Sequence, residues 1–294
     1  MMRAATLVAI LSALMVSCGN ADPDPTDISS DQEEFFSGSL MFRGHEDITR
    51  FGITYANNLM KSEFGVSNYF PTVAKGEACT STAHTILLGD CATDDPDTTL
   101  TNYYGVPASS FGSDPDLQEL HFLRNYAGSG VESGFAACDN ETGWIIYLTQ
   151  MAMLYWQDGD VAAAHYWMGH VLHAVQDSFG PAHTRRGGTL YRTLTDVCSY
   201  GRQVSGVCYH QLFDTRDTIW KSTFYCKVLD WNRSWSCLTP QAQSAAYATA
   251  GYLRVIGRHV KGGFAGDLEA KLTAWFQGGA VDSYSDYFHC ETLP

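Results

Sequence analysis

The central stretch of the chain, residues 169–183, reads GHVLHAVQDSFGPAH. His173 and Asp177 stand four residues apart, which on a helix places an imidazole and a carboxylate one turn apart on the same face. A Gly-Pro pair then ends the helix, so that the chain turns and His183 returns towards that face. Imidazole nitrogens and carboxylate oxygens are zinc ligands, and this stretch therefore predicts a helix that presents a metal site.

The same spacing recurs at His210 and Asp214, within the run YHQLFD. A single pair of this kind is more often a surface ion pair or a packed histidine than a metal site, because it supports a helix on its own. Two such pairs, with His183 between them, favour metal binding.

Much of the remaining chain has the apolar periodicity of helices, and no alternating strand pattern is sustained for more than a few residues. The sequence therefore predicts an all-α fold in a single multi-helix domain. The predicted helices are residues 46–61, 143–156, 160–178, 210–220 and 241–260. The Asp-rich segment 89–117 is expected to be a long loop, a kind of segment that often carries function.

The charge balance argues against a basic protein that binds nucleic acid. The chain of 294 residues has 32 acidic and 18 basic side chains, which gives a net charge of -14. Such a surface repels a polyanion unless bound metal reverses the field locally. Hydrophobic residues make up 45% of the chain, so a packed core is expected rather than disorder.

The N-terminus predicts export. Arg3 precedes an apolar run at residues 4–16 that is too short to cross a bilayer but suits a signal peptide. The run ends in LMVSCG, which resembles a bacterial lipobox in which Cys18 is lipidated; an ordinary secretory signal is the alternative. Residues 1–18 are thus a predicted signal peptide and residues 19–40 a tether. We expect a secreted or lipid-anchored protein outside the bacterial cytoplasm, with no transmembrane helix in the mature chain.

Eight cysteines remain besides Cys18, an even number that suits disulfides in an oxidising compartment. Short loops favour local pairs and leave two cysteines over, although the sequence alone leaves the connectivity open. The favoured pairs are Cys79 with Cys91, Cys198 with Cys208, Cys226 with Cys237, and Cys138 with Cys290. A cysteine-based zinc site is disfavoured, because no two cysteines have the close spacing that such sites use.

Together these residues resemble the zinc-dependent phospholipase C family, whose pattern is His-x3-Asp-x5-His followed by a distant His-x3-Glu/Asp. Three further segments are similar to family motifs: GHEDIT at 44–49, LHF at 120–122 and TAGY at 249–252. The resemblance covers about residues 44–261. It implies a disulfide-stapled helical domain at 41–262 around a zinc cluster, with residues 263–294 as an extension packed on the same domain.

The resemblance also implies two to three zinc ions and their ligands. These ligands are His121, His173 and Asp177 for one ion, and His183, His210 and Asp214 for a second. Asp177 would bridge to a third ion, which the family holds with the residue matching His45 and an N-terminal Trp. No Trp precedes His45 in this chain. The third site therefore has a different partner, depends on a further cleavage near Phe35, or is weak.

The family's general base is an Asp on the loop before the His-Phe motif. The run GDCATDDP at 89–96 resembles that segment, which implies Asp95 as the base and Asp94 as the reserve. Divalent ions would polarise a phosphodiester and offset its charge, releasing diacylglycerol and a phosphorylated headgroup. The expected partner is a phospholipid or a membrane-surface substrate, with no stable nucleic-acid partner; the oligomeric state is left open.

Two alternatives stand beside this interpretation. The single-strand-specific zinc nuclease family shares the central motif, and both Arg186-Gly187-Gly188 and the run at 210–215 resemble its signatures. The segments around His45 and His121, the TAGY run and the acidic charge favour the lipase. The alternative of another class is a non-catalytic helical surface protein whose histidines merely pack. Metal content distinguishes that protein from the two enzymes.

Overall fold

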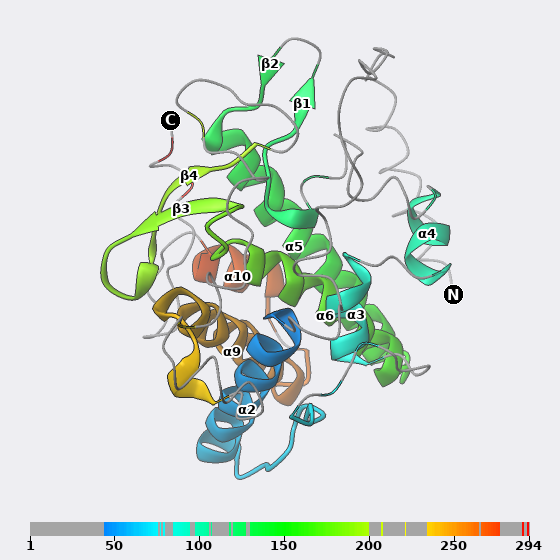
Figure 1. The fold of residues 1–294 in the computed structure, drawn as a ribbon. Helices are drawn as coiled ribbons and strands as arrows, with labels where there is room; N and C mark the ends of the chain where they lie inside the picture. The colour runs from blue at the N-terminus through cyan, green and yellow to red at the C-terminus, as the bar shows by residue number, and fades with distance from the viewer. Residues whose placement is uncertain are drawn as a thin grey trace.

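The computed structural model describes most of the chain between residues 44 and 276 and two residues near the C-terminus (Figure 1). The described residues are 44–75, 77, 79, 85–94, 98–105, 107, 118, 120–127, 130–199, 207, 221, 234–264, 266–276, 290 and 293.

Helices dominate the described part. They are α2 (Gly44–Phe64), α3 (Ile86–Ala92), α4 (Thr98–Tyr104), α5 (Gly134–Gln157), α6 (Val161–Asp177), α9 (Pro240–Lys261) and α10 (Leu268–Phe276). The strands are β1 (Tyr126–Ala127), β2 (Gly130–Val131), β3 (Thr184–Gly187) and β4 (Thr193–Val197), and short 3-10 turns cover Thr189–Tyr191 and Trp235–Cys237.

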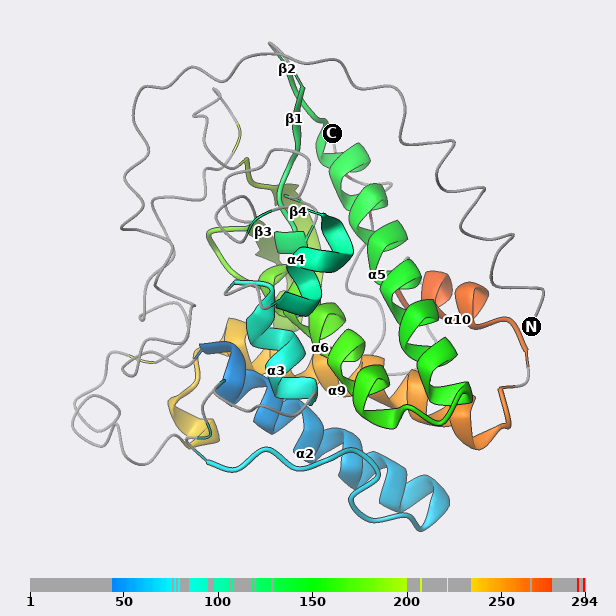
Figure 2. The same cartoon turned by 90° about the vertical axis from the view of Figure 1, so that its right-hand side faces the viewer.

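Helix α6 is the centre of the fold. It contacts α3, α5 and α9, and Figure 2 shows it between α3 and α5. Fourteen of its 17 residues are buried, as expected for a helix that is covered on most sides. Asp160 caps its N-terminus by accepting a hydrogen bond from the Ala163 amide at 3.0 Å. The last residue of this buried helix is Asp177, so the predicted metal site lies inside the molecule.

Glycines allow α3 to approach α6 closely. A Cβ atom on Gly169 would lie 2.2 Å from the Ile86 carbonyl oxygen and 2.5 Å from the Asp90 amide nitrogen. A Cβ on Gly89 would lie 1.8 Å from the Tyr166 carbonyl oxygen. Because these neighbours are backbone atoms, they cannot rotate away. The two glycines therefore set the separation of the helices that carry much of the candidate site.

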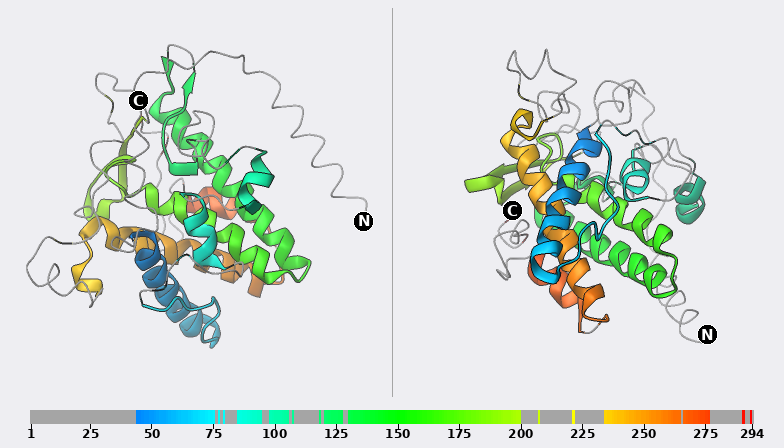
Figure 3. Two further views of the ribbon diagram at one scale, coloured as in Figure 1. Left: turned by 45° about the vertical axis from the view of Figure 1, so that its right-hand side comes forward. Right: turned by 90° about the horizontal axis from the view of Figure 1, so that it is seen from below.

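Helix α2 runs beside α9, as the views in Figure 3 show. Gly52 makes this approach possible, because a Cβ there would lie 2.3 Å from the Cγ2 atom of Thr249. Near the end of α2, the Glu63 carboxylate pairs with Arg254 and with Arg258, whose Nε lies at 2.6 Å. This pairing fixes α2 along α9 and so sets the position of the N-terminal end of α2.

The all-α prediction fits only broadly, because the described residues include two small antiparallel sheets. In the first, Tyr126 pairs with Val131. In the second, β3 pairs with β4, from Thr184 with Val197 at one end to Gly187 with Thr193 at the other. Each strand has two to five residues. Strands of this length are too short to show a clear alternation in the sequence.

Three predicted helices, 46–61, 160–178 and 241–260, correspond closely to α2, α6 and α9. Helix α5 begins nine residues before the predicted 143, where Ser133 caps it by accepting from the Ala136 amide at 3.1 Å. The prediction of a loop throughout 89–117 is wrong in part, because α3 extends to Ala92 and α4 covers Thr98–Tyr104. The predicted helix 210–220 lies outside the described residues.

Two of the four predicted disulfides are confirmed. Cys79 bonds to Cys91, and Cys138 bonds to Cys290, with Cα atoms 6.0 and 5.4 Å apart. Cys198 and Cys237 are disulfide-bonded as well, whereas Cys18, Cys208 and Cys226 lie outside the described residues. Within the described ranges, no helix combines the length and apolarity needed to cross a membrane.

Candidate metal centre

Five of the seven predicted metal ligands meet at one buried place. His45 comes from the first turn of α2, and His173 and Asp177 from the last turns of α6. His121 comes from a short 3-10 segment, and His183 from the turn after α6. Their exposed fractions are 2% for His45, 7% for His121, 0% for His173, 2% for Asp177 and 3% for His183. His210 and Asp214 lie outside the described residues, as does Asp95, the predicted base.

The Asp177 carboxylate is the centre of this group. Its Oδ1 atom lies 3.2 Å from His45 Nε2 and 3.6 Å from His183 Nε2. Its Oδ2 atom lies 3.0 Å from His173 Nε2 and 3.5 Å from His121 Nδ1. One carboxylate thus faces a pair of imidazoles on each of its two oxygens, which is an arrangement that can bridge two cations.

Backbone carbonyls fix the tautomers of two of these histidines. His173 Nδ1 donates to the Asp90 carbonyl at 2.8 Å, and His183 Nδ1 donates to the His121 carbonyl at 2.5 Å. A neutral imidazole carries only one N–H, so each Nε2 then directs a lone pair at the Asp177 carboxylate. Lone pairs facing each other at this range repel unless a cation lies between them. That cation is a proton or a metal ion.

The pKa values of the group follow from the same proximity. Burial alone would lower the pKa of His45, but its contacts with Asp177 and the charges of Asp90 and Asp94 outweigh burial and raise it well above its usual value. Burial would likewise lower the pKa of His173, but the charges of Asp177 and Asp94 outweigh burial and raise it above its usual value. Burial would raise the pKa of Asp177, yet His173 and His183 hold it well below its usual range.

Asp94 extends the group towards solvent. Its Oδ1 atom lies 3.5 Å from His173 Nε2 and 3.7 Å from His121 Nδ1, and these two nitrogens lie 3.3 Å apart. Ligand atoms bonded at about 2.0–2.1 Å to a tetrahedral zinc ion stand about 3.3–3.4 Å apart. The side chain of Asp94 is 17% exposed, against 0–9% for His173, His121 and Asp177. This side of the group is therefore the most open to water.

The donor types fit a zinc ion. Two sets of side chains each place one ligand atom per residue within 4.8 Å of the others, namely His45 with His173 and Asp177, and Asp94 with His121 and His173. Imidazole nitrogen and carboxylate oxygen suit zinc and related divalent ions. A third set, Glu46 with Cys79 and Cys91, offers no thiolate, because its cysteines are joined in a disulfide.

The turn after α6 explains how His183 reaches the group. The Gly180 amide donates to the Asp177 carbonyl at 2.8 Å, and the His183 amide donates to the Gly180 carbonyl at 3.0 Å. A Cβ atom on Gly180 would lie 2.9 Å from Cδ2 of the His183 ring. A residue without a side chain is therefore needed where the ring folds back over the turn.

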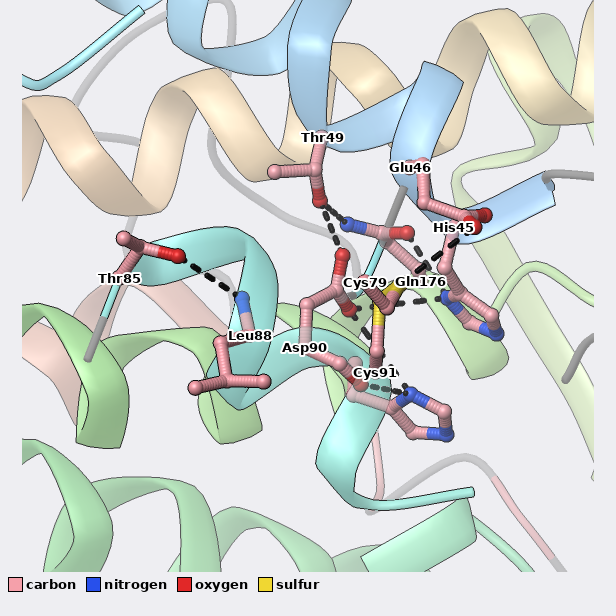
Figure 4. The surroundings of a disulfide bond; sticks show 10 residues. His45, Glu46, Thr49, Cys79, Thr85, Leu88, Asp90, Cys91 and Gln176 are labelled. Carbon is pink, nitrogen blue, oxygen red and sulfur yellow. Dashed lines mark hydrogen bonds and ion pairs between the residues drawn. A yellow bond between two sulfur atoms is a disulfide. The ribbon is translucent and has the colours of Figure 1, made fainter. Parts of the chain in front are cut away.

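Three polar residues at the site had no role in the sequence-based interpretation: Thr49, Asp90 and Gln176. Asp90 is fully buried, and its Oδ1 atom lies 3.8 Å from the Nδ1 atoms of both His45 and His173. All three lie inside segments whose sequence resembles family motifs. Their types are common, however, and their spacing in the sequence says nothing of contacts between α2, α3 and α6. Figure 4 shows them together beside the Cys79–Cys91 disulfide.

His170 has the role expected of a buried histidine rather than of a ligand. Its Nδ1 atom is hydrogen-bonded to the Thr93 hydroxyl at 2.8 Å, and its ring packs edge-on against Tyr166. Burial, with the charge of His173, lowers its pKa to about 3. The ring is therefore neutral at any pH at which the protein is expected to work.

Comparisons with protein-family models, with curated proteins and with solved structures give no match to this chain.

Proposed function

We propose that the protein is an exported, zinc-dependent phosphodiesterase of the phospholipase C type. The observation that carries this proposal is the Asp177 carboxylate, whose two oxygens face two pairs of imidazoles in a buried group. A buried group of this kind is favourable only with bound cations. The order of these residues along the chain is the order of the motifs in the family that the sequence resembles.

The side chains have distinct roles in this proposal. His121, His173, Asp94 and Asp177 hold one ion, and His45 and Asp177 hold another. The resemblance adds His183, His210 and Asp214 as the ligands of a further ion. When bound, zinc ions polarise the phosphodiester and offset its negative charge. The protein supplies the geometry, through α6 and the helices packed against it.

Asp95 remains our proposal for the general base, which would accept a proton from the attacking water. Asp94 is assigned to metal binding instead, because its carboxylate oxygen lies within 3.7 Å of two candidate ligand nitrogens. Because Asp94 and Asp95 are adjacent, the zinc content and turnover of their alanine variants can be compared directly. Asp94→Ala should lose bound zinc, whereas Asp95→Ala should keep its zinc and lose turnover. Loss of zinc from Asp95→Ala would instead make Asp95 a ligand.

A phospholipid is favoured over single-stranded nucleic acid as the substrate. The nuclease alternative used Arg186, yet its Nε donates to the Ser178 carbonyl and its guanidinium lies 4.2 Å above the Phe179 ring. This arginine therefore braces the turn after α6. The net charge of -14 also opposes binding to a phosphate backbone.

The test is an assay of one zinc-loaded preparation on three substrates: vesicles of phosphatidylcholine, vesicles of phosphatidylethanolamine, and single-stranded DNA. We expect diacylglycerol from at least one lipid, and no release from the Asp177→Asn variant. Release of 5'-nucleotides without diacylglycerol would reverse the choice of substrate. Inactivity on all three substrates would favour the non-catalytic alternative.

A further inference from the structure

A chain of hydrogen bonds connects His45 to a buried carboxylate on another helix (Figure 4). His45 Nδ1 lies 2.9 Å from Gln176 Oε1, Gln176 Nε2 donates to Thr49 Oγ1 at 2.6 Å, and the Thr49 hydroxyl donates to Asp90 Oδ2. His45 and Thr49 belong to α2, Gln176 to α6 and Asp90 to α3. The chain therefore joins the three helices that surround the metal centre.

The Asp90 carboxylate, at one end of this series of hydrogen bonds, determines which group donates in each of them. The Asp90 carboxylate only accepts, so it takes the single hydroxyl proton of Thr49. The Thr49 oxygen must then accept from the amide NH2 of Gln176, which turns the Gln176 carbonyl towards His45. A carbonyl also only accepts, so His45 carries a proton on Nδ1. The Nε2 atom of neutral His45 is then a bare lone pair, 3.2 Å from Asp177 Oδ1.

We propose that Thr49, Gln176 and Asp90 form a relay that positions His45 as a metal ligand, by holding its proton on Nδ1 and its ring in the orientation that directs Nε2 at the metal centre. The three are positioning residues, since none of them needs to touch a metal ion or the substrate. Partners that hydrogen-bond the far nitrogen of a histidine ligand fix its tautomer and orientation, and their loss weakens metal binding by about 10- to 100-fold.

Burial makes the relay sensitive to the loss of any one of its hydrogen bonds. Thr49 and Asp90 are fully buried and Gln176 is 3% exposed, so water has little access to replace a lost bond. The His45 ring is also stacked on His173, with ring centroids 4.2 Å apart and planes inclined by 18°. His173 Nδ1 donates to the backbone carbonyl of the same Asp90. One residue of α3 thus determines the tautomers of two stacked imidazoles, through its side chain for His45 and through its backbone for His173.

The variant Thr49→Val tests the relay, because it removes the hydroxyl and keeps the shape. Zinc titrations in competition with a chelator should show about 10-fold weaker binding of at least one ion. Thr49→Ser restores the hydroxyl and should restore the affinity. The matched control is Thr149→Val, an equally buried threonine on α5 that bonds to the Tyr252 hydroxyl at 2.8 Å, and its zinc affinity should be that of the wild type. Gln176→Met breaks the same relay at another point and should weaken zinc binding like Thr49→Val.

A second measurement needs neither metal nor activity. In metal-free protein labelled with nitrogen-15, NMR should detect a slowly exchanging proton on His45 Nδ1, identified by its absence in His45→Gln. This proton should exchange much faster in Thr49→Val and in Gln176→Met. Wild-type zinc affinity together with an unchanged His45 proton in both variants would overturn the relay. The inference rests on the proposed function only for the use that the protein makes of the relay. A slowly exchanging His45 proton in a protein without phosphodiesterase activity would support the relay and refute the proposed enzymatic activity.

Discussion

At the scale of single residues, the candidate metal centre is explained by what a buried carboxylate requires. Asp177 is 2% exposed, and three of the four imidazoles around it, His45, His173 and His183, have their Nδ1 atoms hydrogen-bonded elsewhere. In their neutral forms these three rings direct a bare Nε2 at its oxygens, and a bare nitrogen repels a carboxylate unless a cation lies between them. In the metal-free protein these cations are protons, in agreement with the raised pKa values of His45 and His173. Metal ions would replace those protons.

Asp177→Asn should therefore abolish the centre more completely than any other single substitution. The amide keeps the size of the side chain but removes the charge that faces both imidazole pairs, so bound zinc should fall by at least one ion and turnover by about 100-fold or more. Elemental analysis and the lipid assay measure the two effects. Asp196→Asn, which alters a carboxylate paired with Arg124 and 9% exposed, is the control and should keep its zinc. Near wild-type turnover in Asp177→Asn would refute the bridging role.

His170 predicts how stability depends on pH. Its pKa is about 3 in the folded protein and about 6.5 in an unfolded chain. The unfolded state therefore binds a proton first as the pH falls, and the free energy of unfolding decreases below about pH 6.5, by up to about 1.4 kcal/mol per pH unit. His170→Gln lacks this titration. The stability advantage of the wild type over this variant should shrink between about pH 7.5 and 5, in urea unfolding with chelator present. An advantage that is constant over this range would contradict the assignment.

At the scale of elements, the long helices and the meeting of His45, His173 and Asp177 could be predicted, because the helices and the His-x3-Asp spacing have strong local signals. Helix α6 has a long apolar pattern, the capping residue Asp160 and two candidate ligands one turn apart. The seven-residue helices α3 and α4 are too short for a periodic pattern, and the strands are shorter still. The relay residues could not be predicted, because Thr49, Asp90 and Gln176 act through contacts between helices that spacing along the chain does not reveal.

The close approach of α3 to α6 gives a prediction for Gly169→Ala. The new methyl group would overlap backbone atoms of α3, so the free energy of unfolding should fall by about 1–3 kcal/mol. Zinc affinity should fall too, since α3 carries Asp90 and leads directly into Asp94. Gly143→Ala on α5 is the control, because a Cβ there has no neighbour within 4 Å and should stabilise the helix by about 0.5–1 kcal/mol. Equal melting temperatures for the two variants would refute the role of Gly169.

At the scale of the whole molecule, the disulfides and the candidate metal centre connect helices that pack against one another, namely α2, α3, α5 and α6. The Cys138–Cys290 bond closes a loop of 152 residues between α5 and the C-terminal region, and Cys79–Cys91 attaches α3 to the segment that follows α2. Both bonds limit the freedom of the unfolded chain. Metal ions bound between α2, α3 and α6 would stabilise the folded state further, because they bind the folded chain and not the unfolded one.

The metal content of the intact protein tests the central claim most directly. Protein purified without chelator from its native compartment should contain at least two zinc ions per chain by elemental analysis, because Asp177 faces imidazoles on both of its oxygens. Removal of the zinc with a chelator should lower the melting temperature and abolish phosphodiesterase activity, and added zinc should restore both. A folded protein that releases diacylglycerol with no bound metal would contradict the account.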